Sequence, residues 1–285
     1  MQFWRDNLTR TFANAPPKEP VAILLHHALS ALKSRYPGLS TSVMKGWFMR
    51  LINAREQYMD NRPYPSMEAL ETYGENTYST LMYLTLAALP LHSMTVDHVA
   101  SHIGKATGIV AVLRGLPLIA FPPPPNHHSN NAAFSGVLDG RAGGRHGAVV
   151  LPLDIMVDAG VKEEDVLRQG SGANGLKDAV FKVATRANDH LITVEEMLKN
   201  LRQGKDAGHE FEHDGEEGHH YTDLSTRNTQ ADLERSFGVL IPAVATRLWL
   251  EKLEKLDFDV FRPELRAREW KLPWRAYWAY TQRRI

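Results

Sequence analysis

Apolar residues recur every three to four positions along nearly the whole chain, and this spacing constrains the fold more than any other feature. It is clearest in DHVASHIGKATGIVAVLRGLP, residues 97–117, where one stripe comprises Val99, Ile103, Ala106, Val110, Leu113 and Leu116. Because a helical turn takes about 3.6 residues, such a stripe lies on one face of a helix. Thr95 and Asp97 favour a helix start, and Pro117 predicts the helix end.

The same periodicity predicts further helices on both sides of this stretch. They are expected at about residues 20–36, 40–60, 66–89, 176–204, 229–256 and 270–283. Ser66 is a candidate N-cap, and Glu68 favours the first turn after it. Strand-like alternation is weak and confined to GAVVLPLDI, residues 147–155. The sequence therefore predicts an all-α fold with a central helix bundle.

Two segments break the helical periodicity within what is expected to be a single helical domain of residues 1–285. Residues 118–147 are rich in proline, asparagine and glycine, and residues 203–230 are acidic and rich in histidine. Segments with so few apolar side chains bury too little surface to become ordered by themselves. We expect a mobile insertion at the first segment and a mobile linker at the second.

The overall composition excludes several classes of function. The 33 basic and 33 acidic residues cancel, so neither nucleic acid nor anionic lipid is expected as the main partner. No cysteine is present, which excludes disulfides, thiolate catalysis and cysteine-ligated zinc. We find no apolar run of the roughly 20 residues needed to cross a bilayer, and no secretory signal at the N-terminus.

Two patterns suggest a ligand, but a simpler interpretation is favoured for each. GSGANG, residues 170–175, matches G-x-G-x-x-G, yet a dinucleotide site needs a strand before it. The preceding VKEEDVLRQ is typical of a charged helix, so an inter-helix loop is predicted. Several histidines fall in the two irregular segments: His127, His128, His209, His213, His219 and His220. Nothing there fixes the geometry that a metal requires, so no metal site is predicted.

Two pairs of side chains are spaced four residues apart, so each pair falls on one helical face. Asp154 and Asp158 could hold magnesium on a diphosphate, or face solvent with Asp154 in the first turn of a helix. His98 and His102 could ligate a metal, or make polar contacts where helices meet. We favour the second interpretation for both pairs, because Asp154 suits the first turn of a helix and no third ligand is evident for the histidines.

The aromatic and basic segment EWKLPWRAYWAYTQRR, residues 269–284, has three interpretations. Tryptophan and tyrosine beside arginine are common anchors of protein recognition. The same residues could make an interfacial membrane contact, or belong to a helix packed on the bundle. Packing on the bundle is the favoured interpretation of the three.

Several stretches carry a resemblance to a known family. DHVASHIGKATGIVAVLRGLP and LPLDIMVDAGV resemble the squalene and phytoene synthase superfamily. MQFWRDNL, PPKEPVAI, YGENTYSTLMYLTL and LDFDVFRPEL resemble more closely one branch of it, whose members act in the assembly of mitochondrial complex I. The resemblance implies an isoprenoid-synthase-like helical bundle around a central apolar cavity. It also implies that the first helices of that fold precede Met1.

The resemblance implies a lost active site. Enzymes of this superfamily use two aspartate-rich motifs that hold magnesium and the diphosphates of two prenyl substrates. The second motif should begin directly after Arg114 and repeat four residues later, where this chain has Gly115 and Ile119, with Leu118 between them. The first motif belongs to a helix expected before Met1. A catalytically inactive protein is therefore expected, with no catalytic residue, metal or cofactor.

The implied cavity has candidate lining residues in two stretches. Gly104 and Gly108 should allow another helix to approach closely. The predicted ligand-binding residues combine a polar-edged helical face with an apolar wall: Tyr73, Asn76, Thr77, Thr80, Gly108, Ile109, Val112 and Arg114.

The resemblance implies a role in complex I assembly through binding of a complex I subunit or another assembly factor. It implies a location in mitochondria, on the matrix side of the inner membrane, with scope for a hydrophobic ligand in the cavity and a peripheral membrane contact. Two alternatives remain open. One is an active isoprenoid diphosphate synthase using Asp154 and Asp158, and the other is a passive binder of a prenyl lipid or quinone.

Overall fold

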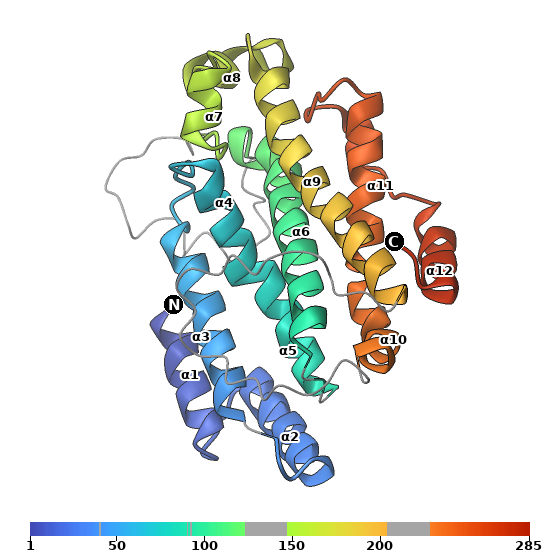
Figure 1. Cartoon of the computed structure of the whole chain (residues 1–285). Helices are drawn as coiled ribbons and strands as arrows, with labels where there is room; N and C mark the ends of the chain where they lie inside the picture. The colour runs from blue at the N-terminus through green and yellow to red at the C-terminus, as the bar shows by residue number, and fades with distance from the viewer. Residues whose placement is uncertain (40, 90, 92, 123–146, 204–228) are drawn as a thin grey trace.

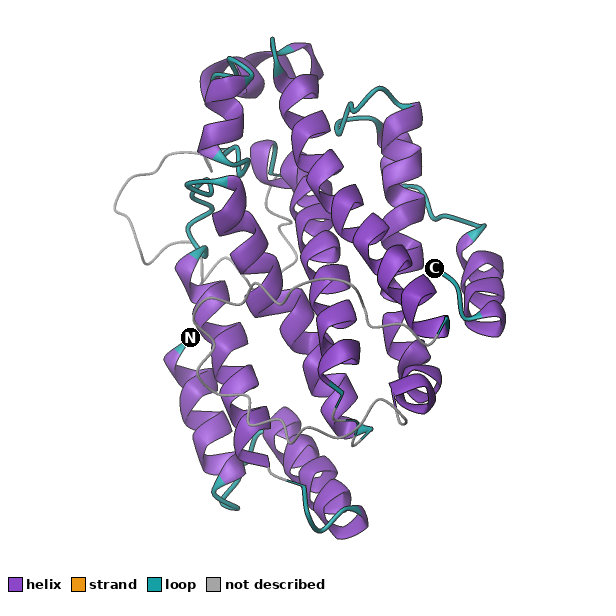
Figure 2. Ribbon diagram, viewed as in Figure 1, coloured by secondary structure: helices purple, strands orange, loops and turns teal. Residues whose placement is uncertain are grey.

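Helices are the only regular secondary structure in the part of the chain that the structure describes. It is a computed structural model that describes residues 1–39, 41–89, 91, 93–122, 147–203 and 229–285. The helices are α1 (Gln2–Phe12), α2 (Pro20–Arg35), α3 (Thr41–Gln57), α4 (Met67–Gly74), α5 (Thr80–Ala88), α6 (Met94–Ala120), α7 (Leu153–Asp158), α8 (Glu163–Gln169), α9 (Leu176–Arg202), α10 (Thr229–Leu240), α11 (Pro242–Lys255) and α12 (Leu272–Gln282). A π-helical turn, η1 (Glu75–Ser79), and 3-10 turns η3 (Gly170–Gly172) and η4 (Pro263–Arg266) complete them. The all-α prediction is confirmed (Figure 2).

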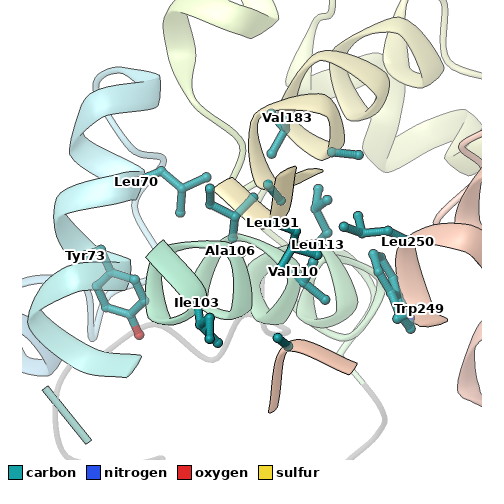
Figure 3. Packing of buried hydrophobic residues seen from close by; sticks show 14 of the residues in the cluster. Leu70, Tyr73, Ile103, Ala106, Val110, Leu113, Val183, Leu191, Trp249 and Leu250 are labelled. Carbon is teal, nitrogen blue, oxygen red and sulfur yellow. The ribbon is translucent and has the colours of Figure 1, made fainter. Parts of the chain in front are cut away.

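Helix α6 lies at the centre of the bundle, with α4 and α5 on one side and α9 and α11 on the other (Figure 1). All six members of its predicted apolar stripe are buried, so the stripe is confirmed. Side chains of α4, α9 and α11, among them Leu70, Leu191 and Trp249, converge on this helix (Figure 3). Burial of this apolar surface is the main force that holds the two halves of the chain together.

Helix α6 does not end at Pro117, which corrects the sequence prediction. It continues to Ala120, and the Phe121 backbone N–H donates to the Pro117 carbonyl at 3.1 Å. A proline removes only its own N–H from the helical hydrogen bonds, and burial of Leu116 and Ala120 stabilises the continued turn. The first residues of the predicted insertion 118–147 are therefore helical. Residues 123–146 lie outside the described part.

Helix α6 also corrects the prediction that no segment is long and apolar enough to cross a bilayer. By length and composition its 27 residues are sufficient. However, 61% of its most apolar stretch is buried inside the protein, as is usual for a central core helix.

Helices α4 and α5 form one continuous helical run through the π-turn η1, close to the predicted helix 66–89. The predicted N-cap is confirmed, since the Ser66 hydroxyl accepts from the Ala69 backbone N–H at 3.2 Å. The π-turn widens the backbone, and the Thr80 hydroxyl donates to the Glu75 carbonyl at 3.1 Å. The result places Glu75 and Tyr78 beside α6.

The α4–η1 segment approaches α6 more closely than any side chain would allow. A β-carbon added at Gly104 would lie 2.4 Å from the Ser79 Cα, and one added at Gly108 would lie 2.6 Å from the Gly74 Cα. Glycine at both positions is therefore required by the packing. The predicted close approach of a second helix is confirmed.

The predicted helix at 229–256 is two helices, α10 and α11, with a break at Ile241. Proline at position 242 has no N–H to donate and its ring clashes with the preceding turn, so it starts a new helix. Thr229 belongs to α10 although the predicted linker 203–230 includes it. Residues 204–228, with their four histidines, lie outside the described part, as do His127 and His128.

The GSGANG segment forms η3 and the turn before α9, which confirms an inter-helix loop. Gly175 has a φ of +73°, and an added β-carbon there would lie 1.9 Å from the Ala159 carbonyl oxygen. The helix before it is the charged α8, where the nucleotide-binding pattern would require a strand. The weak strand-like alternation noted from residue 147 does not produce a strand, since residues 147–150 have no regular secondary structure.

Candidate functional site

A pocket of about 360 Å³ lies between α6 and the segment that connects α3 to α4. Its described lining residues are Met1, Arg55, Tyr58, Met59, Asn61, Arg62, Tyr64, Tyr73, Tyr78, Ala111, Val112, Gly115, Ile119 and Val150. One wall is aromatic and basic, and the α6 wall is apolar. A volume of this size suits a small ligand or a few side chains of a partner.

Tyrosines form the wall that faces α6. The rings of Tyr58, Tyr64 and Tyr73 lie 4.5 to 5.4 Å apart, centre to centre. Such tilted and edge-on pairs stabilise one another beyond the area they bury. Burial raises the pKa of all three phenols, so they are neutral near pH 7 and present rings and hydroxyl groups.

Arginine supplies the positive charge of the pocket. The Arg55 guanidinium carbon lies 5.6 Å from the centre of the Tyr73 ring and 5.7 Å from that of Tyr78, which is cation–π geometry. Arg62 is held by Asp60, with 2.8 Å between its Nε and a carboxylate oxygen. Arg55 is therefore placed by aromatic faces, and Arg62 by a neighbouring carboxylate.

The α6 wall consists of Ala111, Val112, Gly115 and Ile119, so no carboxylate faces the pocket from this helix. None of the described lining residues is acidic. Magnesium needs several oxygen ligands, of which carboxylates are the usual ones. The described lining residues of this pocket therefore do not fit a magnesium–diphosphate centre. They suit an apolar or anionic group, which the arginines and ring edges could contact.

The structure distributes the eight predicted ligand-binding residues over several environments. Tyr73 and Val112 line the pocket. Ile109 is fully buried in the core, and Arg114 is exposed on α6. Gly108 faces the backbone of Gly74.

The remaining three predicted residues lie in or beside the π-turn. Thr77 and Thr80 are buried, and both hydroxyls donate to backbone carbonyls of their own helical run, at 2.6 and 3.1 Å. Asn76 is half-buried. Sequence reasoning missed Arg55, Tyr58 and Tyr64. The only pattern that could have indicated them is the crowding of tyrosine and arginine in REQYMDNRPYP, residues 55–65, at the end of one predicted helix and before the next.

A second cluster of polar groups is buried where α4, α6 and α9 meet. Glu71 accepts from His190 Nε2 at 2.8 Å and is also paired with Arg186. The Nδ1 atoms of His190 and His102 lie 2.9 Å apart, and the His98 and His102 ring centres are 4.9 Å apart. The prediction that His98 and His102 make polar contacts between helices is confirmed for His102.

The charge of Glu71 is strongly favoured in this cluster. Burial opposes ionisation of the carboxyl group, but hydrogen bonds from His190 and Arg186 outweigh it and lower its pKa to about 2. The described residues hold no group of three or more potential metal ligands. Because Glu71, His102 and His190 come from α4, α6 and α9, their contacts link these three helices.

A second buried carboxylate interaction centres on Glu75 in the π-turn. The Tyr83 hydroxyl and the Ser101 hydroxyl each donate to it at 2.7 Å. Burial and the adjacent Glu75 charge raise the pKa of Tyr83 well above its ordinary value. This interaction joins α5 and α6 through the π-turn.

Asp154 and Asp158 have structural roles at separate places. Asp154 accepts from the Met67 backbone N–H at 3.0 Å and from the Ile155 N–H at 2.7 Å, so it adds an acceptor at the N-terminus of α4 and lies in the first turn of α7. Asp158 pairs with Lys182 at 3.6 Å. The first-turn interpretation of Asp154 is confirmed, and neither carboxylate lines the pocket.

Comparison with known proteins gives a consistent result. A family model for squalene/phytoene synthase matches residues 1–118 and 139–278. A mouse protein named "NADH dehydrogenase (ubiquinone) complex I, assembly factor 6" is 32% identical over 277 residues, which are 97% of this chain and 64% of that protein. The human protein of that name is 29% identical over 96% of this chain and 62% of its own length. A Drosophila melanogaster homologue is 26% identical over 98% of this chain and 65% of its own length.

The chain thus spans less than two thirds of the length of these relatives. No solved structure matches it.

Proposed function

The chain belongs to the squalene/phytoene synthase family, and on that premise we propose that it is a non-catalytic member that acts in the assembly of mitochondrial complex I. It does so by binding a complex I subunit or another assembly factor. Support comes from the mouse, human and fly relatives, whose names are complex I assembly factor 6 or a homologue of it. The same relatives support a location in mitochondria, which we place on the matrix side of the inner membrane.

The observation that carries this proposal is the composition of the α6 wall of the pocket. Gly115 and Ile119 stand at the positions where the family resemblance implies the second aspartate motif, and both line the pocket. Departure of a diphosphate builds up negative charge, which carboxylate-held metal ions offset in a dry site. Removing one electrostatic group from an active site costs about 10²–10³ in rate, so replacing both carboxylates argues against turnover.

Binding is what the remaining pocket supports. Neutral tyrosine rings, the Arg55 guanidinium and the apolar α6 wall can contact an apolar segment or an anionic group without a chemical step. We therefore assign to the pocket the recognition of a partner segment or a hydrophobic ligand. The alternative of an active synthase using Asp154 and Asp158 is disfavoured because both carboxylates are engaged elsewhere.

The experiment deletes the gene in the source organism and measures assembled complex I on native gels. We expect the deletion to lower complex I and the wild-type gene to restore it. Gly115→Trp, which fills the pocket, should fail to restore it. The matched control is Leu118→Trp on the same helix, where the side chain is exposed and the large ring has room.

A second measurement tests the absence of catalysis. The purified protein is incubated with farnesyl or geranylgeranyl diphosphate and Mg²⁺, and released pyrophosphate is measured. We expect none above the rate without protein. Pyrophosphate release that disappears in Asp154→Ala would reverse the proposal, as would normal complex I in the deletion strain.

A further inference from the structure

Helix α12 lies at the edge of the molecule and is attached through one narrow face (Figure 1). Its buried residue Ala279 and half-buried Leu272 pack against Val244 and Leu248 of α11. The interpretation favoured from the sequence is that this aromatic helix packs on the bundle. It is wrong for most of the aromatic rings, which are exposed. Small and aliphatic side chains make this contact with α11, and of the rings only Tyr280 has a described ring contact with the bundle, 6.5 Å from Phe237 of α10 between ring centres.

The opposite face of the same helix is aromatic. Trp274, Tyr277 and Trp278 are 65%, 62% and 58% exposed, and Trp270 just before the helix is 72% exposed. At about 100° per residue, positions 274, 277 and 278 fall within one third of the helix circumference, and Ala279 and Leu272 fall on the other side. Three of the six tryptophans of the chain are thus directed to solvent together.

The charge around this face is unlike that of the rest of the chain. Residues 262–285 contain seven arginine and lysine residues and two glutamates, a net charge of +5, whereas the whole chain is neutral. No acidic residue occurs within α12 itself. Lys271 and Arg275 flank the aromatic face and are exposed, and the Lys271 ammonium lies 5.8 Å from the centre of the Trp270 ring.

We propose that the α12 face formed by Trp270, Trp274, Tyr277 and Trp278, with Lys271 and Arg275 beside it, binds the surface of an anionic lipid bilayer. Tryptophan and tyrosine favour the boundary between headgroups and hydrocarbon because one end of the ring system is apolar and the other is polar. A helix with such a face and basic flanks lies in the plane of the interface. Anionic headgroups attract each nearby lysine or arginine.

The charge and geometry favour a membrane over a protein groove. Tryptophan and tyrosine also anchor protein interfaces, but here they stand in a segment with a net charge of +5, which an anionic bilayer surface complements. The bulky rings project away from the bundle, where a flat surface can meet all of them. The chain as a whole is neutral, so its composition does not reveal the local excess of positive charge in residues 262–285. For that reason total composition alone does not predict anionic lipid as the main partner.

This inference rests on the proposed function only for the choice of lipid, since an inner-membrane location calls for cardiolipin as the anionic component. The surface is also separate from the pocket, because none of its residues lines that pocket. The two proposals can therefore fail independently.

The test is co-sedimentation of the full chain with vesicles of phosphatidylcholine and cardiolipin, compared with vesicles of phosphatidylcholine alone. We expect binding to the anionic vesicles, a blue shift of tryptophan fluorescence, and weakening as salt is raised. Trp274→Gln/Trp278→Gln should weaken binding about tenfold or more. Lys271→Gln/Arg275→Gln should weaken it by about tenfold and remove most of the salt dependence.

The matched control is Phe3→Gln, which removes an aromatic side chain that is 58% exposed on α1 and should leave binding unchanged. Circular dichroism and thermal melting establish that each variant is folded. Equal sedimentation of wild type and the tryptophan variant would overturn the inference, as would binding that is independent of anionic lipid. So would loss of a protein partner in the tryptophan variant with vesicle binding intact.

Complex I assembly separates the two proposals. A tryptophan variant that no longer binds vesicles but still restores complex I leaves the proposed function standing and shows that membrane attachment is dispensable for it. Vesicle binding by a protein whose deletion leaves complex I unchanged supports the surface and removes the function.

Discussion

Helix α6 contains glycines whose surroundings differ sharply. An added β-carbon at Gly104 would meet the Ser79 backbone at 2.4 Å, whereas one at Gly115 finds its nearest neighbour, the flexible Ile119 Cδ1, at 3.9 Å. The first contact requires the helices to separate, and the second is ordinary van der Waals contact. Identical residues in one helix therefore serve different purposes.

We expect Gly104→Ala to lower the free energy of unfolding by about 1–3 kcal/mol, because overpacking forces the backbone of η1 away from α6. Gly115→Ala is the control, and it should be neutral or stabilise by up to about 1 kcal/mol through helix propensity. Urea denaturation measures both. Equal effects of the two substitutions would show that the close crossing does not constrain the fold.

Glu71 should make the stability of the fold depend on pH. Its pKa is lowered from 4.5 to about 2, so its interactions with His190 and Arg186 stabilise the folded chain above pH 4.5. That stabilisation is lost as the pH falls from about 4.5 through about 2, because the unfolded chain then binds a proton that the folded chain does not. Burial of the side chain keeps the effect from being screened by solvent.

Glu71→Gln should therefore destabilise most near neutral pH, on the order of 3 kcal/mol, and the difference from wild type should shrink toward pH 3. Urea denaturation at several pH values measures it. Glu196→Gln, an exposed position on α9, serves as the control and should change little. A difference that is constant over the whole pH range would contradict the assignment of the lowered pKa.

At the level of whole helices, the N-terminus of α4 is held by a side chain from a distant helix, α7. Asp154 caps α4 from the start of α7, across 87 residues of sequence. Asp154→Ala should cost about 1 kcal/mol of unfolding free energy, as N-cap losses do. Asp158→Ala removes only the exposed 3.6 Å pair with Lys182 and should change stability little. Denaturation of the two variants side by side tests the capping role, and an equal loss of stability in both would contradict it.

Most of the long helices could be predicted from the sequence because they carry a continuous apolar period, which burial then enforces; α1 (Gln2–Phe12) was not predicted. The errors occur at prolines. Pro117 lies inside α6 because neighbours on both sides are buried, whereas Pro242 starts a new helix that the periodicity had joined to α10. Local pattern alone does not distinguish these two cases, since the outcome depends on packing from distant parts of the chain.

Residues of the candidate site could be predicted only where they form a pattern of residues close together in the sequence. Gly115 and Ile119 were identified through the family pattern, and both line the pocket. Glu71 and His190 are 119 residues apart, and the pocket joins Arg55 near the end of α3 to Tyr64 in the segment between α3 and α4. No periodicity indicates such contacts, because the fold alone brings these residues together.

For the molecule as a whole, α6 contacts helices from both ends of the chain, from α4 and α5 to α10 and α11. Neither half of the chain can bury its apolar surface without this helix. The prediction that residues 1–285 form one domain therefore has a physical test. Calorimetry should give a single unfolding transition whose van't Hoff and calorimetric enthalpies agree.

A substitution at the centre of α6 should shift that whole transition. Leu113 is fully buried, and Leu113→Ala should lower the free energy of unfolding by about 2–5 kcal/mol through lost burial and the cavity left behind. Leu118→Ala, 53% exposed on the same helix, makes the same chemical change and should have little effect. If Leu113→Ala instead split the transition in two, the halves of the chain would be separate folding units, and α6 would stabilise only one of them.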